Sequence, residues 1–380
     1  MALVTANLNK KKCSLCEKKS IEISEKLGVC KECLIDNTKE AMLIITKKRL
    51  IYRKEFNLPL SPPKTKGGIN CGDCVNNCVL GENEFGFCNL VKNEKGQLIR
   101  IAGDVSKGFF SFYYDPLPTN CVAAPFCAGC TSNGYPHYSY VNGPEIGYNN
   151  LAVFYQSCTF DCLYCQNYQY RKGVHLSKPS SPNTLIDAIK PKTSCICFFG
   201  GDPASQIRHS NKVGHLALEK AFREKRIIRV CWETNGSAKP ALMEDTTGIA
   251  LFSGGTIKID VKSYDDILTK ALCGSSNKYT LQNLNEIGSY LDQRPESPLL
   301  IASTLLVPGY IDVDQVRKIA KFLVDINPKI PYSLLAFYPT FVIDDLPTTS
   351  ATHAKECLNA AKDEGLTNVW IGNSHLLRET

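Results

Sequence analysis

The spacing of three cysteines near the middle of the chain constrains its fold more than any other feature. Cys158, Cys162 and Cys165 form a CxxxCxxC run that directly follows the apolar stretch 151–155. Three thiolates so close together can hold three irons of a 4Fe–4S cluster and leave the fourth iron open to another ligand. On spacing alone, a structural zinc ion or a complete cluster with a distant fourth ligand also fits.

Cysteine use throughout the chain points to metal binding rather than to disulfides. The 380 residues include 19 cysteines, many of them in CxxC-type pairs, and the N-terminus lacks the apolar core of a signal peptide. No apolar run approaches the roughly 20 residues that a bilayer-spanning helix needs. We therefore expect a cytoplasmic protein that makes no membrane contact.

Short apolar segments alternate with amphipathic ones from residue 151 onwards. The predicted strands are 151–155, 194–199, 227–232, 256–261, 299–305 and 332–337, and the predicted helices are 184–190, 211–224, 238–244, 280–292, 313–325 and 350–364. Six β–α units in series predict a parallel sheet with outer helices. With right-handed crossovers we expect an α/β fold, a partial (β/α)6 TIM-like barrel with its site at the carboxyl ends of the strands.

The cysteine pattern divides the chain into three predicted regions. Residues 1–60 form a zinc-ribbon-like module followed by a helix that Asn37 could cap and that runs to about Glu55. Residues 61–150 form a second cysteine-rich, metal-binding region, entered through the Pro- and Gly-bearing linker 58–68. Residues 151–380 form the barrel, so the fold carries an N-terminal cysteine-rich extension.

Two sets of four cysteines upstream of the barrel have the spacing of metal ligands. One set forms two CxxC knuckles and predicts a tetrahedral, structural zinc site, with a grip on RNA or a protein partner as the alternative; its members are Cys13, Cys16, Cys30 and Cys33. The other set fits zinc, a single iron or an auxiliary 4Fe–4S cluster; its members are Cys71, Cys74, Cys78 and Cys88.

The remaining cysteines and the histidines carry weaker signals. Cys121, Cys127 and Cys130 are one ligand short of a site, and His137 is a candidate fourth ligand without further support. We expect five others to be ordinary buried or half-buried thiols: Cys195, Cys197, Cys231, Cys273 and Cys357. His209 and His215 are expected at the surface, near the start of a helix.

Polar residues follow the ends of two successive predicted strands, 194–199 and 227–232. Gly200 and Gly201 allow a ligand to approach the backbone, and the Asp202 carboxylate could accept from an ammonium group. Glu233, Thr234 and Asn235 offer groups that suit ribose hydroxyls. Taken alone, the Gly-Gly and Asn-Gly pairs are also typical of plain turns.

Asp260 and Lys262 share one face of the fourth predicted strand by alternation. Together they could hold a zwitterionic amino acid, with the aspartate on the ammonium and the lysine on the carboxylate. A structural ion pair is the alternative.

These motifs follow one another in an order that is typical of one family. The series is CxxxCxxC, Gly-Gly-Asp-Pro at 200–203, Glu-Thr-Asn-Gly at 233–236, Asp-Val-Lys at 260–262 and Leu-Val-Pro-Gly at 306–309. It resembles the radical SAM superfamily over about residues 150–345. The likeness is strongest to the glycyl-radical-enzyme activating enzymes of the pyruvate formate-lyase activating type. A broader likeness, to uncharacterised archaeal and bacterial homologues, extends upstream through Cys71–Cys88.

This resemblance implies a radical SAM barrel, a 4Fe–4S cluster and S-adenosylmethionine (SAM), which is reductively cleaved to a 5′-deoxyadenosyl radical that abstracts hydrogen from a substrate. It implies that Cys158, Cys162 and Cys165 are the catalytic cluster ligands. It also implies a low-potential electron donor of the flavodoxin or ferredoxin type. The implied SAM-binding residues are Tyr164, Gly200, Gly201, Asp202, Thr234, Asn235, Asp260 and Lys262.

Two positions depart from the activating enzymes. Ser303 and Thr304 stand where those enzymes tend to carry an arginine, and Tyr338 stands at about the place of a histidine. We expect an enzyme with both changes still to cleave SAM. The substrate of the activating enzymes, however, cannot be assigned to this chain by resemblance.

A protein or peptide substrate is favoured over RNA, but two other functions compete. The formal net charge is +7, and residues 1–60 supply +6 of it, with 13 Lys and Arg against 7 Asp and Glu. This basic segment and the zinc ribbon motivate a radical SAM enzyme that modifies tRNA or other RNA, although a solvated basic face is the simpler reading. The third candidate is a non-catalytic iron–sulfur protein that transfers electrons.

Overall fold

A single large sheet forms the centre of the protein in a computed structural model that describes residues 9–379. Its eight strands lie in the order β14-β13-β12-β11-β10-β9-β8-β7. The strands from β8 to β14 run parallel, each beside its neighbour in sequence, and β7 is antiparallel to β8. Their bounds are β7 Phe110–Pro116, β8 Asn149–Tyr155, β9 Thr193–Gly200, β10 Arg229–Thr234, β11 Ile257–Asp260, β12 Leu300–Leu306, β13 Tyr332–Ala336 and β14 Val369–Ile371.

The prediction of six parallel strands is therefore confirmed, and two edge strands extend the sheet. β7 and β14 were not predicted, because β7 is largely exposed and β14 has only three residues. These two edges do not pair with each other, so the barrel is incomplete. The segment 117–148 crosses from one edge toward the other, and the ring of its Phe126 lies 5.1 Å from that of Trp370 on β14.

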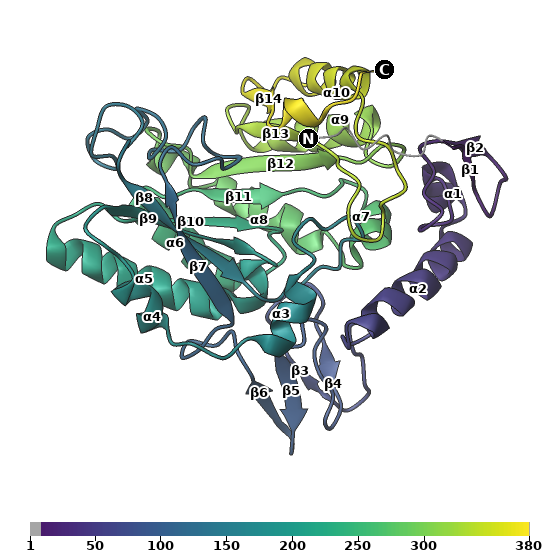
Figure 1. The fold of residues 1–380 in the computed structure, drawn as a ribbon, viewed down its shortest axis with the longest axis horizontal. Coiled ribbons are helices and arrows are strands. Elements are labelled where there is room, and N and C mark those ends of the chain that lie inside the picture. The colour runs from purple at the N-terminus through teal and green to yellow at the C-terminus, as the bar shows by residue number, and fades with distance from the viewer. Residues whose placement is uncertain (1–8, 380) are drawn as a thin grey trace.

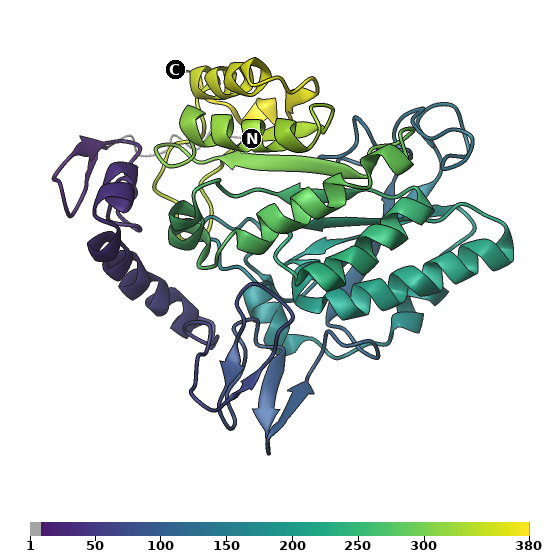
Figure 2. The same ribbon diagram turned by 180° about the vertical axis from the view of Figure 1, so that it is seen from behind.

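Helices follow the strands and cover the outer face of the sheet (Figures 1 and 2). Their bounds are α3 Tyr170–Leu176, α4 Pro182–Asp187, α5 Ile207–Glu224, α6 Pro240–Ser253, α7 Asp266–Cys273, α8 Lys278–Gly288, α9 Val313–Ile326 and α10 Ala351–Asp363. Short 3-10 turns lie at Pro203–Gln206, Leu291–Gln293 and Ser374–Leu376. Each of the six predicted helices is present, whereas α3 and α7 were not predicted.

Helix α9 shows why the amphipathic pattern located the helices well. Val316, Ile319, Ala320 and Leu323 are buried and recur at the spacing of one helix face. The side chain of Asp312 accepts a hydrogen bond from the Gln315 N–H, which caps the first turn. Helix α6 runs nine residues beyond the predicted end and stops where Gly254 adopts a left-handed conformation, with φ of 76°.

The N-terminal region wraps around one side of the sheet (Figure 1). A small hairpin and helix α1 come first, then the long helix α2 leads toward two further hairpins. The bounds are β1 Lys11–Lys12, β2 Lys19–Ser20, α1 Lys31–Asp36, α2 Thr38–Glu55, β3 Ile69–Asn70, β4 Val79–Leu80, β5 Val91–Glu94 and β6 Gln97–Arg100. The predicted helix after Asn37 is thus confirmed, but the Asn37 side chain makes no capping hydrogen bond.

The first module shares a hydrophobic core with the barrel rather than standing apart from it. Leu27 and Leu34 belong to the same buried cluster as Phe160 and Leu163, which lie within the CxxxCxxC run. The Tyr310 hydroxyl donates to the Val29 carbonyl at 2.8 Å. The fold therefore brings residues 13–55 against the predicted site.

None of the helices within residues 9–379 combines the length and apolar composition needed to cross a lipid bilayer.

Candidate active site

The CxxxCxxC run lies on the loop after β8, residues 156–169, at the carboxyl end of the parallel strands. We call this segment the cluster loop. Cys158, Cys162 and Cys165 line a cavity of about 270 Å³, which we call the cluster-loop cavity. Among the described residues, they are the only cysteines in its lining. Other side chains and backbone that line this cavity come from the loops or ends of β8, β9, β10, β11, β12 and β13: Tyr164, Gly200, Gly201, Asp202, Glu233, Asn235, Lys258, Asp260, Lys262, Ser303, Leu305 and Leu335.

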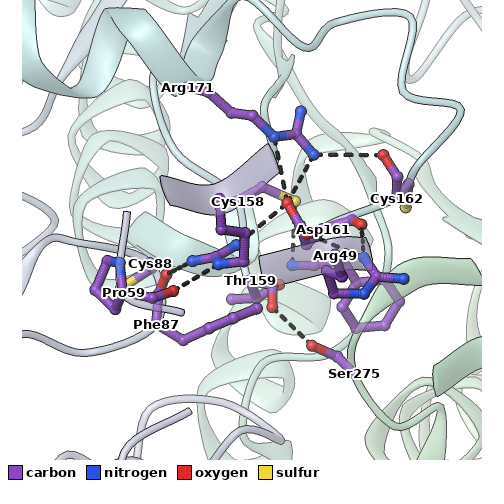
Figure 3. Close-up of polar contacts among 12 residues, drawn as sticks. Arg49, Pro59, Phe87, Cys88, Cys158, Thr159, Asp161, Cys162, Arg171 and Ser275 are labelled. Carbon is purple, nitrogen blue, oxygen red and sulfur yellow. Dashed lines mark hydrogen bonds and ion pairs between the residues drawn. The ribbon is translucent and has the colours of Figure 1, made fainter. Parts of the chain in front are cut away.

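Asp161, directly before Cys162, is the centre of a buried ionic cluster (Figure 3). Arg49 and Arg53 reach it from helix α2, at 2.9 and 3.2 Å, and Arg171 reaches it from helix α3, at 2.9 Å. Asp161 is 2 % exposed, and the three guanidinium groups hold the pKa of its carboxyl well below the usual range, against the effect of burial. The cluster carries a net charge of +2 beside the thiols, which favours thiolates and an anionic metal centre.

Two of these arginines also bind the backbone around the loop. Arg49 donates to the Asp161 carbonyl and, at 2.7 Å, to the Ala271 carbonyl. Arg171 donates to the Cys162 carbonyl at 3.3 Å. The sequence reasoning missed these arginines, since Arg49 and Arg53 lie more than 100 residues from Asp161. The local signal is that they continue, at four-residue spacing, the buried face that Ala41 and Ile45 begin.

Cys273, at the end of helix α7, lies behind the cluster loop. Its thiol is hydrogen-bonded to Cys162 and lies 3.3 Å from the Tyr164 hydroxyl. Cys273 is fully buried and does not line the cluster-loop cavity. It was expected to be an ordinary buried thiol; it is buried, but it contacts a cluster-loop cysteine.

The two glycines after β9 are required by packing as well as by any ligand. Gly200 has φ of 110°, and a side chain there would press on Tyr155 N and the Phe154 ring. A Cβ on Gly201 would overlap the carbonyl oxygen of Ser157, the residue before Cys158. Both glycines let the end of β9 lie directly against the cluster loop.

Asp202 is buried and its oxygens are already engaged. They accept from the Thr234 hydroxyl at 2.7 Å and from the N–H groups of Asn235 and Ala204 at 2.6 and 2.8 Å. Burial raises the pKa of Asp202 to about 6, and these donors oppose that effect. Asp202 therefore ties the end of β9 to the end of β10.

Thr234 and Asn235 occupy different places relative to the cavity. The Thr234 hydroxyl donates to Asp202, and Thr234 does not line the cavity, whereas Asn235 does. The Asn235 amide donates to the Thr159 hydroxyl at 2.9 Å and approaches the Cys158 sulfur at 3.8 Å. Asn235 thus holds the cluster loop from the neighbouring strand.

Charged residues at alternate positions of β11 and of the segment that follows it line the cavity: Lys258, Asp260 and Lys262. Asp260 pairs with Lys258 at 2.8 Å and Lys262 at 3.0 Å, and the Ser303 hydroxyl donates to it at 2.5 Å. Lys258 also pairs with Glu233 at 3.1 Å. The two lysines lower the pKa of Asp260, and the carboxylates raise the pKa values of both lysines. Asp260 and Lys262 share one face, as predicted, and they form the ion pair that was the alternative to ligand binding; Lys258, which was not predicted, joins this pair.

Of the two positions that depart from the activating enzymes, Ser303 lines the cavity and Tyr338 does not. Tyr338 is 38 % exposed and does not line the cluster-loop cavity, whereas Leu335 of β13 does.

The prediction that His209 lies at the surface was wrong. This residue is fully buried, and its Nδ1 is hydrogen-bonded to the Tyr155 hydroxyl at 2.7 Å. His215 is exposed, as expected.

The four N-terminal thiols form a compact set. All four sulfurs lie within 4.8 Å of one another, with Cys13 and Cys33, and Cys16 and Cys30, 3.7 Å apart. A tetrahedral ion with Zn–S distances of about 2.3 Å places its sulfurs about 3.8 Å apart. The geometry therefore fits one tetrahedral metal ion held by Cys13, Cys16, Cys30 and Cys33.

The second set of four lies beside the cluster loop. Cys71, Cys74, Cys78 and Cys88 surround a small cavity of about 20 Å³ that Thr159 also lines. The Ser157 hydroxyl donates to the Cys88 carbonyl at 2.8 Å. Burial raises the pKa values of Cys71 and Cys88 to about 11 and about 12. These four thiols line one cavity, but no three of their sulfurs lie within 4.8 Å of one another, unlike those of the N-terminal set.

Comparisons with known proteins agree with the site. Residues 152–323 match the family model described as the radical SAM superfamily. The uncharacterized protein MJ0808 of Methanocaldococcus jannaschii is 23% identical over 315 residues, which cover 80% of this chain and 81% of that protein. MJ1632 of the same organism, named as a glycyl-radical enzyme activating enzyme, is 26% identical over 193 residues, or 50% of this chain and 68% of that protein.

The solved structures that match part of this chain are distant from it. A domain of pyruvate-formate lyase-activating enzyme from Bacteroides vulgatus is 20% identical, with a TM-score of 0.36 over 46% of this chain and 96% of that domain.

The match to the radical SAM family model implies a 4Fe–4S cluster and SAM, and the residues of the cavity fit both. Three cysteines without a fourth in the cavity lining can hold three irons and leave one open. In front of them stand two lysines and two carboxylates, the charges that an amino acid's two ends require.

Proposed function

We propose that this chain, whose residues 152–323 form a radical SAM domain, is an enzyme that abstracts hydrogen from a protein or peptide substrate. The observation that carries the proposal is the convergence of Cys158, Cys162 and Cys165 on one polar cavity. When bound there, a reduced 4Fe–4S cluster and SAM supply a 5′-deoxyadenosyl radical. The chemistry belongs to the cofactors, and the chain binds, orients and shields them.

The charged residues of the cavity suit a zwitterionic ligand. Lys258 and Lys262 carry two positive charges, and Asp260 and Glu233 carry two negative ones, so the set is neutral. In this proposal a lysine binds the SAM carboxylate and Asp260 or Glu233 binds its ammonium. Asp202 acts as a positioning residue, since its oxygens hold Thr234 and Asn235.

Shielding comes from aromatic side chains. Phe160, Tyr164 and Tyr170 line the cavity and are each at most 4 % exposed. An apolar wall limits access of water to a reactive radical.

A polypeptide substrate is supported by the relative named as a glycyl-radical enzyme activating enzyme. The basic segment that motivated RNA binding is less available than its charge suggests. Arg49 and Arg53 are buried on Asp161, and Lys31 pairs with Asp312 at 2.7 Å. We therefore retain the preference for protein over RNA.

The two outer thiol sets complete the proposal. We assign zinc to Cys13, Cys16, Cys30 and Cys33 as a structural ion. The set of Cys71, Cys74, Cys78 and Cys88 would hold zinc or iron, and the proximity of Cys88 to the cluster loop suits an electron path from a flavodoxin- or ferredoxin-type donor.

Reductive cleavage of SAM tests the enzyme class. The protein is reconstituted anaerobically with iron and sulfide, reduced with dithionite and given SAM, and 5′-deoxyadenosine is measured. We expect product from the natural chain and from Cys357→Ala, a buried thiol on helix α10, and none above background from Cys162→Ala. Undiminished product from Cys162→Ala would overturn the cluster assignment, and none from the natural chain would favour an electron-transfer protein.

Deuterium transfer tests the substrate class. Protein and RNA fractions from cells grown in D2O are supplied separately, and deuterium in 5′-deoxyadenosine is measured by mass spectrometry. We expect transfer from the protein fraction that protease treatment removes. Transfer from the RNA fraction alone would replace this proposal with RNA modification.

A further inference from the structure

A second, larger cavity adjoins the cluster-loop cavity on the inner face of the sheet. It has a volume of about 380 Å³, and five thiols line it: Cys121, Cys127, Cys195, Cys197 and Cys231. We call it the thiol cavity. Val122, Glu233 and Lys258 line both cavities, so the two are contiguous.

The strand thiols face this cavity because of the strand period. Cys195 and Cys197 are two residues apart on β9 and therefore share a face. Cys231 of β10 is the direct partner of Cys197 in the parallel register. Neither thiol of this cross-strand pair has another described role in the active site.

The loop thiols enter from the segment 117–148, which is anchored firmly. Glu145 of this segment is fully buried and pairs with Arg229 of β10 at 2.6 Å. Cys121 donates to the Glu233 carboxylate at 2.9 Å, so its sulfur lies at the boundary between the two cavities. Cys127 is hydrogen-bonded to the Cys130 thiol across a tight turn. Residues from three distant parts of the chain therefore converge on one space.

We propose that the thiol cavity holds an iron–sulfur centre ligated by Cys121, Cys127, Cys197 and Cys231. Thiols are weak hydrogen-bonding groups, so five of them around one cavity serve a polar ligand poorly but suit iron well. The inference goes beyond the proposed function, which needs only the cluster held by Cys158, Cys162 and Cys165.

The spacing of the sulfurs favours a cluster over a single ion. Within residues 9–379, the N-terminal zinc set is the only group of three or more ligands whose atoms all lie within 4.8 Å. No three sulfurs of the thiol cavity therefore lie within 4.8 Å of one another, and the same holds for Cys158, Cys162 and Cys165. A single ion draws its sulfurs together, whereas a cluster keeps them apart because each binds a different iron. The volume of the cavity provides room for such a group.

The proposed iron–sulfur centre adjoins the charged residues of the cluster-loop cavity. Glu233 contacts Cys121 on one side and Lys258 on the other, so it connects the proposed centre to the charged residues of the cluster-loop cavity. An iron–sulfur centre there lies beside the space that a substrate must reach, where it could ligate the substrate or exchange an electron with it.

Iron content tests the proposal in a chain that cannot cleave SAM. The background is Cys158→Ala with Cys162→Ala and Cys165→Ala, reconstituted with iron and sulfide. To this are added Cys121→Ala with Cys127→Ala, or Cys197→Ala with Cys231→Ala, or Cys357→Ala as the matched control. Iron and acid-labile sulfide are counted, and zinc content and circular dichroism establish that each variant is folded.

We expect each cavity pair to lose the two irons of a [2Fe–2S] or the four irons of a [4Fe–4S] cluster relative to Cys357→Ala, with zinc unchanged. Any iron at Cys71, Cys74, Cys78 and Cys88 is common to all the variants and cancels. Equal iron in all folded variants would overturn the proposal. Because the background lacks the SAM-binding cluster, this outcome is independent of whether the chain cleaves SAM.

Discussion

Arg49 of helix α2 is bound to Asp161, the residue directly before Cys162 in the cluster loop, with 2.9 Å between Nη1 and Oδ2. The contact joins residues 112 positions apart. Because Arg53 of the same helix also reaches Asp161, the N-terminal extension is part of the support of the active site rather than a separate module.

Replacing Asp161 with asparagine should destabilise the protein and impair cluster retention. The variant leaves three buried guanidinium groups without their shared carboxylate, and loss of one partner of a buried ion pair costs about 3–5 kcal/mol. The midpoint of urea unfolding and iron per chain measure the effect. Asp245→Asn, at an exposed pair with His215, should change stability by less than about 1 kcal/mol. Equal effects of the two substitutions would contradict a structural role for Asp161.

Gly201→Ala should prevent normal assembly of the cluster loop. The added Cβ overlaps the Ser157 carbonyl, so either the loop or the end of β9 must move. We expect loss of iron bound at Cys158, Cys162 and Cys165 and loss of 5′-deoxyadenosine formation. Gly248→Ala is the control, because a Cβ there meets nothing within 4 Å and alanine favours the α6 helix by about 0.5–1 kcal/mol. Full iron content in Gly201→Ala would show that the packing is looser than the structure indicates.

Cys16→Ala should remove the structural metal ion. Three thiolates remain, and the tetrahedral site loses one corner. We expect zinc to fall from one ion per chain to nearly none, and the N-terminal module to lose several kcal/mol of stability, since structural zinc contributes about 10–16 kcal/mol of apparent binding energy. Elemental analysis and thermal unfolding measure both quantities, with Cys357→Ala as the control. Retention of one zinc ion in Cys16→Ala would exclude this ligand set.

Because His209 is buried, we expect the free energy of unfolding of the protein to decrease in mild acid. Burial lowers its pKa from 6.5 to about 4, so the unfolded chain takes up a proton as the pH falls through about 6.5, whereas the folded chain does not. The stability that this group contributes is complete above pH 6.5 and is lost as the pH falls toward 4, by about 3 kcal/mol. Urea midpoints between pH 7 and 4 should show a weaker pH dependence in His209→Gln than in the natural chain.

The control for this pH dependence is His215→Gln, on the same helix α5 but at an exposed position. It should keep the acid-dependent loss of stability. An identical pH profile for His209→Gln and the natural chain would assign the effect to other groups.

The sequence by itself determined the parallel sheet and the position of the cluster loop. Amphipathic periodicity and short apolar runs are local properties, so helices such as α9 and the six inner strands could be read from the chain. The CxxxCxxC run is likewise local, and strand order places it at the carboxyl ends of the strands. Asp260 and Lys262 could be assigned to one face because alternation along a strand is fixed by backbone geometry.

Only the tertiary structure decided what surrounds these residues. Asp202 and Thr234 are 32 positions apart, and only folding shows that they are hydrogen-bonded to each other. The same reason explains why the sequence did not predict the contacts of Arg49 and Cys273 or the thiol cavity. In each case the partners come from distant segments of the chain. Long-range burial also placed His209 in the core, against its polar character. Local periodicity therefore predicts the elements, whereas contacts across the sheet determine which side chains are free to act.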